Sequence, residues 1–493
     1  MTNKVVLIRP ENVYNYNNYP PLGLISLASS LKKYNFDVCI INCALESNLA
    51  ETLRNELLGA LFVGVSMLTS EVPSVYSIIR HIRERYHLLP IVAGGMHCTL
   101  FPEQVANCDD IDYVIVGGGE EHIVCIAEMF KTKLERKEKI FTKKIVDIEF
   151  LPTPEYNLDH NIEKFITSSL TDKLSEKVKQ PMRWLPYESS RGCPSKCAFC
   201  VNAVTNNNIY RKKSVFKVVN EIDVVVKKYK LTHLKIIDDN FFVDINRVKN
   251  IARRIIERKL NITWDAECRC DYFSDNMLNN DTLRLLKSSG LVQLTLGVES
   301  GSERTLQLMR KGIIPEQSEL AVMKCNRFGI IARSSFMIEV PGERIEDIKQ
   351  TILFINKLRK YKSFTCGIGT FRPYPKCELT KKLLEEEILM EPKDFYSWTS
   401  KDIIDLYTST EQIRPWQVNG KYSEAASYYI NMESAVRLGN YQIDNTLDKI
   451  KNSLFMLIAK IRNRLMFYKF PIDKVLYKRF LEGFYRKKGK ELK

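Results

Sequence analysis

The sequence SSRGCPSKCAFC, residues 189–200, contains the most specific pattern in the chain. Its cysteines, Cys193, Cys197 and Cys200, have CxxxCxxC spacing on a loop that follows a short strand-like run. Three thiolates this close in sequence can hold three irons of a 4Fe-4S cluster and leave the fourth iron open to a ligand. The alternative, a structural zinc site, needs four ligands, whereas this loop has three cysteines and no histidine. The spacing therefore favours an iron–sulfur cluster with one open iron.

Strand-like and helix-like segments alternate downstream of the cysteine loop. Strand candidates occupy residues 187–190, 234–238, 262–268, 292–299, 332–340 and 365–373, and helical periods cover 214–230, 245–259, 278–289, 315–328 and 344–360. This alternation predicts a partial (β/α)6 barrel with parallel strands over residues 181–380. The cysteine loop and other polar motifs follow the strands, at the carboxyl ends where such barrels place their active sites.

The first 135 residues show a second α/β pattern. Short β-rich apolar runs at 5–9, 38–42, 61–68, 90–95 and 113–119 are separated by helical periods. This predicts a Rossmann-like domain with a doubly wound parallel sheet. Glycines follow two of the runs, at the strand ends where such sheets bind ligands, although glycine is also ordinary in turns.

Two further segments complete the predicted organisation. A proline-bounded stretch, LPTPEYNLDH at residues 151–160, predicts a linker over residues 136–180. From residue 381 the strand rhythm fades, which predicts a basic helical domain over residues 381–493.

Composition limits the class of protein. The chain has 493 residues, a formal charge of +15 and 13 cysteines, and it starts with an apolar run too short for a signal peptide. An odd cysteine count in a long chain favours a reducing compartment, so we expect a cytoplasmic protein. The basic excess concentrates after about Lys451, which argues against nucleic acid as the partner. It indicates a solvated helix face or contact with an anionic membrane surface, because aromatic residues interleave with the basic ones: Phe467, Tyr468, Phe470, Phe480 and Phe484.

The cysteine loop, with Phe199 before its last cysteine, closely resembles the radical S-adenosylmethionine superfamily. The resemblance implies that S-adenosylmethionine chelates the open iron and is cleaved to a 5′-deoxyadenosyl radical. The segment IIDDNFF then supplies candidates for the methionyl amino group, Asp238, Asp239 and Asn240, with helix capping as the alternative. The segment LGVESGSER implies that Glu299 binds the ribose hydroxyls, while Ser300 and Ser302 assist or cap a helix.

The barrel departs from the family pattern in two places. SSFMIEVPGE resembles FMIGLPGE but has Glu339 where glycine is usual, so this side chain must turn away if the backbone is to approach adenine. FRPYPKCEL has Lys376 and Cys377 where the family segment PYPGT has glycine and threonine. Arg269 and Arg333 are candidates for the methionine carboxylate, with surface salt bridges as the alternative.

The N-terminal segments PPLGLISLASSLKK, GVSMLTSEV, VAGGMHCTLFPE and VIVGGGEE are similar to the cobalamin-binding subfamily of these enzymes. The resemblance implies that Ser66 and Thr69 bond the nucleotide tail of cobalamin. It also implies that the backbone approaches cobalamin at glycines, namely Gly94, Gly95, Gly117, Gly118 and Gly119. The DxHxxG motif of histidine-ligated cobalamin domains does not occur, so cobalamin without a histidine ligand is expected; His97 as a ligand, or a domain that has lost cobalamin, are the alternatives.

The resemblance implies one leading reaction, transfer of a methyl group from cobalamin to an unactivated carbon. Another radical transformation, such as ring closure, oxidation or rearrangement, fits the same layout. A methylthiotransferase would need a second cluster, for which the N-terminal cysteines have no clear spacing, and a noncatalytic cofactor-binding protein is the remaining alternative. The expected partners are an organic substrate of unknown identity and a one-electron reductant such as flavodoxin or ferredoxin.

Overall fold

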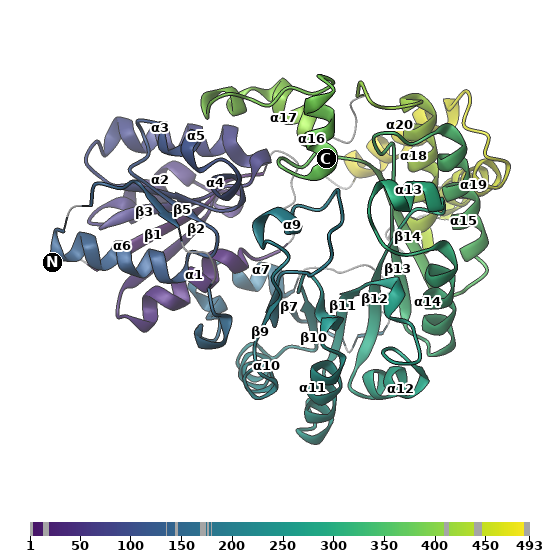
Figure 1. Ribbon diagram of the computed structural model, residues 1–493, viewed down its shortest axis with the longest axis horizontal. Coiled ribbons are helices and arrows are strands. Elements are labelled where there is room, and N and C mark those ends of the chain that lie inside the picture. Colours follow the sequence, from purple (N-terminus) through teal and green to yellow (C-terminus); the bar gives the residue numbers. More distant parts are fainter. Residues whose placement is uncertain are drawn as a thin grey trace.

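The protein contains two parallel β-sheets, each surrounded by helices (Figure 1). The structure is a computed structural model and describes residues 3–12, 19–134, 136–142, 146–167, 174, 177–178, 180–408, 414–437 and 446–487. The N-terminal sheet and its helices lie on the left of Figure 1, and the barrel sheet lies at the centre and right.

The N-terminal sheet has six parallel strands in the order β2-β1-β3-β4-β5-β6. These are β1 (Lys4–Arg9), β2 (Asp37–Asn42), β3 (Phe62–Ser66), β4 (Ile91–Gly94), β5 (Tyr113–Val116) and β6 (Ile140–Thr142). The helices between them are α1 (Leu22–Lys33), α2 (Leu49–Leu57), α3 (Val72–Arg85), α4 (Met96–Leu100), α5 (Pro102–Ala106) and α6 (Glu120–Thr132). The chain direction across the sheet reverses between β1 and β3, which opens a crevice at the carboxyl ends there. The predicted Rossmann-like fold is confirmed.

The segment predicted as a linker contributes the last strand of this sheet. Strand β6 pairs with β5, with Phe141 opposite Ile115. Charged residues surround its few apolar residues, so the run was too short to stand out in the sequence. The next part of the segment includes α7 (Ile162–Ile166) and packs against the barrel, where the buried Tyr156 hydroxyl donates to the Pro186 carbonyl at 2.5 Å.

The barrel sheet has six parallel strands that follow one another in chain order. They are β7 (Trp184–Tyr187), β10 (His233–Ile236), β11 (Thr263–Cys268), β12 (Leu291–Glu299), β13 (Ile331–Ile338) and β14 (Phe364–Thr370). Strands β7 and β14 form the two edges of this sheet, so the barrel is open between them. The predicted partial barrel is confirmed.

The first barrel strand lies earlier than the prediction of residues 187–190. Strand β7 ends at Tyr187, and Ser190 and Arg191 form β8 (Ser190–Arg191), which pairs antiparallel with β9 (Arg211–Lys212). The chain leaves the sheet after Tyr187 because Ser189 and Ser190 hydrogen-bond to the Asp238 carboxylate. The cysteine loop therefore starts from a small ribbon above the barrel.

Helices follow the barrel strands, and several of them begin at side-chain caps. They are α9 (Asn202–Thr205), α10 (Val215–Tyr229), α11 (Ile245–Glu257), α12 (Asn280–Ser288), α13 (Glu303–Leu308), α14 (Pro315–Arg327) and α15 (Ile345–Leu358). Side chains of Ser214, Asp244 and Asn279 accept backbone N–H bonds in the first turns of α10, α11 and α12. These caps explain why the predicted helix starts agree with the structure to within a few residues.

The C-terminal region is divided between two hydrophobic cores. Helices α16 (Glu378–Glu385) and α17 (Lys401–Thr408) contribute Leu383 and Ile404 to the core that contains α3 of the N-terminal unit. Trp398 belongs to the same core, and its indole N–H donates to the Gln104 side chain at 2.9 Å. Helices α18 (Gly420–Arg437), α19 (Thr446–Leu465) and α20 (Ile472–Lys487) lie instead beside the barrel (Figure 1). The region predicted as one helical domain thus serves both units.

Helix α18 covers the edge of the barrel sheet at β14. The Asn431 carboxamide accepts a hydrogen bond from the Ile368 backbone N–H at 2.9 Å and donates one to the Ile368 carbonyl at 2.8 Å. A side chain therefore takes the place that a neighbouring strand would occupy at this residue.

Candidate active site

The cysteine loop lies at the carboxyl end of the barrel sheet. Cys197 is buried, and Cys193 and Cys200 are half-buried. Burial raises the pKa of the Cys200 thiol, and the neighbouring thiols of Cys197 and Cys193 raise it further. N–H donors also face the sulfurs: the Asn240 amide lies 3.4 Å from Cys193 Sγ and an Arg269 nitrogen 3.9 Å from Cys197 Sγ. Such donors stabilise cluster-bound thiolates, so the loop fits a 4Fe-4S cluster.

The three polar residues after β10 have different surroundings. Asp238 is buried and accepts hydrogen bonds of 2.5–2.6 Å from the Ser189 N–H and from the hydroxyls of Ser189 and Ser190. Asp239 is exposed, with one oxygen 2.7 Å from the Gly192 N–H. Asn240 is buried, and its Oδ1 has no hydrogen-bond partner among the described residues. Asp238 therefore fixes the cysteine loop, whereas Asp239 and Asn240 present free acceptors that suit an ammonium group.

Glu299 forms a buried ion pair that its motif does not indicate. Its Oε1 lies 2.8 Å from Lys311 Nζ, and both side chains are at most 10% exposed. Burial alone lowers the pKa of Lys311, but the charge of Glu299 and the Cys197 thiol outweigh this effect and raise it. Lys311 also lies over the Phe199 ring at 5.7 Å. The site therefore has a fixed positive charge beside Cys197, and Glu299 keeps its second oxygen for a hydroxyl ligand.

The two arginine candidates lie at different positions along the barrel axis. Arg269 is beside Cys197 and donates to the Lys311 carbonyl at 2.8 Å. Arg333 pairs with Thr295 and Thr365 in the sheet, five residues before β13 ends. Arg269 thus belongs to the cluster region, and Arg333 belongs to the interior of the barrel.

The interior of the barrel is open and carries charge. Gly367 and Gly369 lie on β14, where an added Cβ would meet no atom within 4 Å. Glu267 on β11 is exposed, and the charge of Lys235 acts on its carboxylate. Glu267 and Arg333 lie in register across the sheet through Thr295, so this face presents both a carboxylate and an exposed guanidinium.

Ser300 and Ser302 are bonded within the protein. The Ser300 hydroxyl lies 2.7 Å from that of Thr351, and Ser302 caps α13 by accepting the Thr305 N–H while donating to Asp347. Ser302 therefore follows the capping alternative, whereas Ser300 bonds a side chain of α15 and caps none of the described helices.

Glu339 turns away from the barrel, as its position in the family pattern requires. It has a positive φ of 59° and is fully buried. Its carboxylate accepts hydrogen bonds from the N–H groups of Val418 (2.7 Å) and Asn419 (3.2 Å) and from the Ser423 hydroxyl (2.6 Å). The residue that replaces glycine therefore anchors the start of α18.

Replacing Glu339 with glycine should loosen α18. The variant loses a charged acceptor for three donors, so we expect the local opening free energy to fall by about 3 kcal/mol. Hydrogen exchange should accelerate over residues 418–430, whereas the exposed control Glu346→Gln should not change it. Unchanged exchange in Glu339→Gly would show that the carboxylate contributes nothing to this anchor.

A cavity of about 270 Å³ lies at the carboxyl ends of the N-terminal strands. It is lined by Ser66 and by all five predicted glycines, together with residues of the barrel unit, Glu188 and Arg191. A Cβ at Gly23 would meet no atom within 4 Å, and one at Gly94 only Ile115 at 3.9 Å. Packing within the chain does not require glycine at these two positions, so their openness fits a ligand that approaches the backbone, as cobalamin does.

An ion pair joins this cavity to the cysteine loop. Arg191 contacts Glu120 of α6 at 2.6 Å and Glu188 at 2.8 Å. Burial raises the pKa of Glu120, but the charge of Arg191 and the hydrogen bonds from Arg191 and Ser26 together outweigh burial and lower it. Glu120 Oε2 is buried without a partner among the described residues, so it can accept a bond from an amide or hydroxyl of a ligand. A second cavity, of about 230 Å³, shares Arg191 with the first and extends to α9.

Thr69 and His97 are not at this cavity. The Thr69 hydroxyl lies 3.2 Å from His97 Nδ1, and neither residue lines either cavity. His97 is fully buried beneath Phe101 and Trp398, with ring centroids 5.2 and 5.3 Å away. The expected contact of Thr69 with cobalamin therefore has no support in the geometry, and the alternative of His97 as a cobalt ligand has none either.

His97 should make stability depend on pH. Burial lowers its pKa to about 3, so the folded protein holds it neutral, whereas the unfolded chain takes up a proton below about pH 6.5. Its contribution is thus lost as the pH falls from about 6.5 towards 3, by about 2 kcal/mol at pH 5. Urea unfolding at pH 7 and pH 5 should show a smaller loss in His97→Asn than in wild type. The exposed control His87→Asn should retain the full loss; an equal loss in His97→Asn would contradict this assignment.

Lys311 and Arg191 are the site residues that the sequence did not reveal. Lys311 stands in the run MRKG at the end of a helix, and Arg191 directly precedes the cysteine motif. The sequence carries no signal for their partners, because both pairs form between separate elements.

Comparison with known families agrees with this geometry. The sequence pattern of the radical SAM superfamily matches residues 187–355, and that of the B12 binding domain matches residues 13–126. A protein named an uncharacterized methyltransferase from Pyrococcus horikoshii is 28% identical over 428 residues, which cover 85% of this chain and 89% of that protein. The anaerobic magnesium-protoporphyrin IX monomethyl ester cyclase of Rubrivivax gelatinosus is 23% identical over 74% of this chain and 66% of its own.

Two solved structures share the fold. The cobalamin-dependent S-adenosylmethionine radical enzyme OxsB, with aqua-cobalamin and S-adenosylmethionine bound, has a TM-score of 0.73 at 18% identity and covers 99% of this chain and 76% of its own. The radical S-adenosylmethionine methyltransferase TsrM from Kitasatospora setae, with cobalamin and a 4Fe-4S cluster bound, has a TM-score of 0.63 at 18% identity over 78% and 75%. With its cysteine loop, its barrel and its N-terminal cavity, the chain belongs to the cobalamin-binding subfamily of the radical S-adenosylmethionine superfamily.

Proposed function

We propose that this enzyme transfers a methyl group to an unactivated carbon of an organic substrate. When bound, the three cofactors supply one-electron cleavage of S-adenosylmethionine, which starts radical chemistry, and a transferable methyl group. The observation that carries the proposal is the Arg191 side chain, which lines both cavities of the N-terminal sheet and directly precedes the cluster cysteines. The methyl donor and the radical source would therefore face the same space.

Different residues of the chain would bind the different groups of S-adenosylmethionine and the substrate. Asp239 and Asn240 present carboxylate and amide oxygens for the methionyl ammonium group, and Glu299 presents an oxygen for the ribose. Lys311 and Arg269 hold positive charge beside Cys197, which suits the methionine carboxylate. The barrel lumen, with Glu267 and Arg333, would orient the substrate.

Ring formation is the second candidate, because the Rubrivivax gelatinosus relative is named a cyclase. The two reactions differ in their by-products. Repeated methylation consumes one S-adenosylmethionine to restore the methyl donor, so it releases S-adenosylhomocysteine as well as 5′-deoxyadenosine. Ring formation without methyl transfer does not need to release S-adenosylhomocysteine.

The test is anaerobic reconstitution of the protein with iron, sulfide and hydroxocobalamin, followed by S-adenosylmethionine and a low-potential reductant. Mass spectrometry then quantifies both by-products with candidate substrates. Equal amounts of the two with a methylated product support the proposal. If the enzyme formed 5′-deoxyadenosine but no S-adenosylhomocysteine with its true substrate, the proposed methyl transfer would be contradicted.

We expect the enzyme to work in the cytoplasm with a flavodoxin or ferredoxin as its electron donor. No helix among the described residues is long and apolar enough to cross a bilayer.

A further inference from the structure

The outer face of α19 carries a stripe of large apolar side chains. Its members are Ile450, Leu454, Leu457, Ile461 and Leu465, which are 48–70% exposed. Their spacing of three and four residues places them on one side of the helix. The opposite side, with Met456, Ala459 and Asn463, is buried against the body of the protein. The stripe is therefore a second apolar face that the hydrophobic core does not use.

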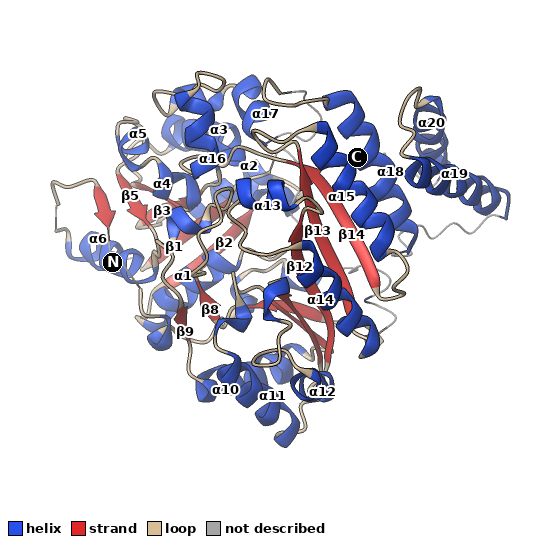
Figure 2. Ribbon diagram, turned by 45° about the vertical axis from the view of Figure 1, so that its right-hand side comes forward, coloured by secondary structure: helices blue, strands red, loops and turns tan. Residues whose placement is uncertain are grey.

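The apolar surface continues past the end of α19. Five more exposed residues lie in the following turn and in α20: Phe467, Phe470, Ile472, Val475 and Leu476, which are 49–75% exposed. We call these ten residues the C-terminal apolar patch. Figure 2 shows α19 and α20 at the right-hand edge of the molecule, away from the N-terminal unit. Many large exposed apolar side chains on neighbouring elements mark an interaction site.

The aromatic residues that suggested such a surface have different roles. Phe467 and Phe470 belong to the patch, but Tyr468 is buried, and Phe480 packs against Phe455 and Tyr477. The side chain of Phe484 lies outside the described residues. The aliphatic stripe of α19, rather than the aromatic residues, therefore makes up most of the surface.

Cations border the patch. Lys460 and Arg464 are exposed on one flank of the α19 stripe, and Lys451 is exposed on the other. Residues 446–482 contain nine lysines and arginines against three acidic residues. Of the acidic residues, Asp448 is buried and Asp473 is paired with Arg462 at 2.6 Å. The patch therefore presents apolar side chains within a positively charged rim.

We propose that the C-terminal apolar patch docks on the surface of a bilayer that contains anionic lipids. Apolar side chains of an amphipathic helix enter the boundary between headgroups and acyl chains, while lysine and arginine bind the anionic headgroups. A second copy of this chain is a poorer partner, because a symmetric contact would bring the same positive rims together.

The test uses the full-length protein in flotation with two kinds of vesicle, phosphatidylcholine alone and an equimolar mixture with phosphatidylglycerol. We expect binding to the anionic vesicles that weakens with salt. Replacing Lys451, Lys460 and Arg464 together with glutamine should weaken this binding roughly a hundredfold, because each cation near an anionic surface contributes about a factor of five. The double variant Leu457→Ser, Ile461→Ser should abolish binding to the anionic vesicles.

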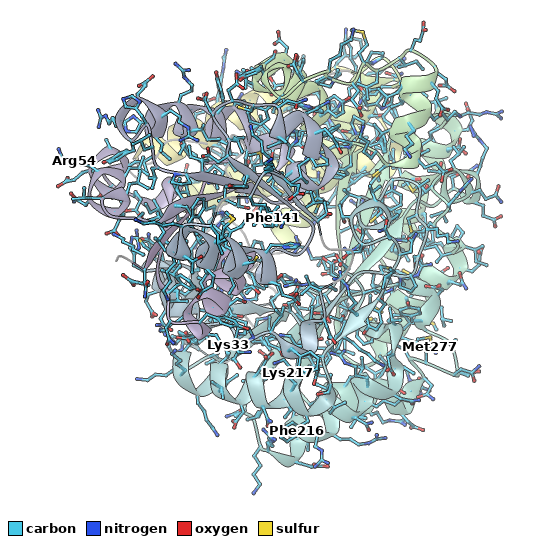
Figure 3. All side chains as sticks on the ribbon, turned by 60° about the vertical axis from the view of Figure 1, so that its left-hand side comes forward. Lys33, Arg54, Phe141, Phe216, Lys217 and Met277 are labelled. Atoms are coloured by element: carbon cyan, nitrogen blue, oxygen red, sulfur yellow. The ribbon has the colours of Figure 1, made fainter. Side chains whose placement is uncertain are left out.

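Matched controls remove the same groups elsewhere. Leu88 is 95% exposed and Phe216 is 74% exposed, the latter on α10 at the lower edge of Figure 3, and their replacement with serine should leave binding unchanged. Lys33, Arg85 and Lys259 are exposed and serve as the charge control. All variants should cleave S-adenosylmethionine as wild type does.

Three results would overturn the proposal. Wild type that floats with neither vesicle excludes lipid docking. Equal binding by the patch variants and their controls excludes this patch as the docking surface. A wild-type dimer in solution that the Leu457→Ser, Ile461→Ser variant converts to a monomer would identify the patch as a contact between two copies instead.

Discussion

Replacing Cys197 with alanine should reduce formation of 5′-deoxyadenosine to background. Cys197 is the most buried of the three thiols, and its sulfur lies 3.9 Å from an Arg269 nitrogen. Two thiolates cannot hold a cubane cluster that also keeps one iron open, so the variant should lose the cluster itself. Iron content and 5′-deoxyadenosine, measured after anaerobic reconstitution, should fall together.

The chain offers a close control in Cys377. This residue is 2% exposed and precedes α16, and its surroundings include Cys200 and the backbone of the cysteine loop, where the Leu379 N–H donates to the Ala198 carbonyl. Cys377→Ala should keep its iron and its activity. If instead Cys377→Ala lost the cluster as Cys197→Ala does, the cluster would have four protein ligands, and no iron would be open to S-adenosylmethionine.

Replacing Arg191 with methionine should destabilise the protein by about 3–5 kcal/mol. Removal of one partner leaves the other charges of a buried network unpaired. Glu120 is 4% exposed and Glu188 is 25% exposed, so neither is well solvated without the guanidinium. Urea unfolding measures the loss, and titration with hydroxocobalamin should show weaker binding, because Arg191 lines the cavity.

A double-mutant cycle separates the ion pair from simple packing. Adding Glu120→Gln to Arg191→Met should restore part of the lost stability, because it removes one of the unpaired charges. Arg253→Met, at an exposed arginine whose side chain bonds Asn250, should cost less than about 0.5 kcal/mol. If the double variant lost as much stability as the two single variants added together, the charges of Arg191 and Glu120 would not stabilise each other.

The sequence was sufficient wherever the pattern is local. Alternating apolar runs predicted both parallel sheets, and the spacing of Cys193, Cys197 and Cys200 predicted a loop at a strand end. Strand β6 was missed because two apolar residues in a charged segment give no periodic signal. The first barrel strand was placed too late because Ser189 and Ser190 bond to Asp238, a residue about fifty positions further along the chain.

The rest of the site depends on contacts between distant segments. Arg191 and Glu120 are 71 positions apart and belong to different units, and no local pattern links them. His97 is buried because Trp398, about three hundred residues later, packs over it. Thr69 consequently faces His97 rather than the cavity, although its motif suggested otherwise. Local periodicity predicts elements, but it does not predict which elements meet.

The contact between Asn431 and Ile368 bears on aggregation. An edge strand with free N–H and C=O groups can recruit a strand of another molecule, and repeated recruitment leads to fibrils. At Ile368 the carboxamide of a helix already occupies both backbone groups, and the bulk of α18 lies over the strand. An incoming strand would have to displace an entire helix before it could pair. The open barrel is therefore protected on this side against intermolecular β-pairing, without the need to close into a ring.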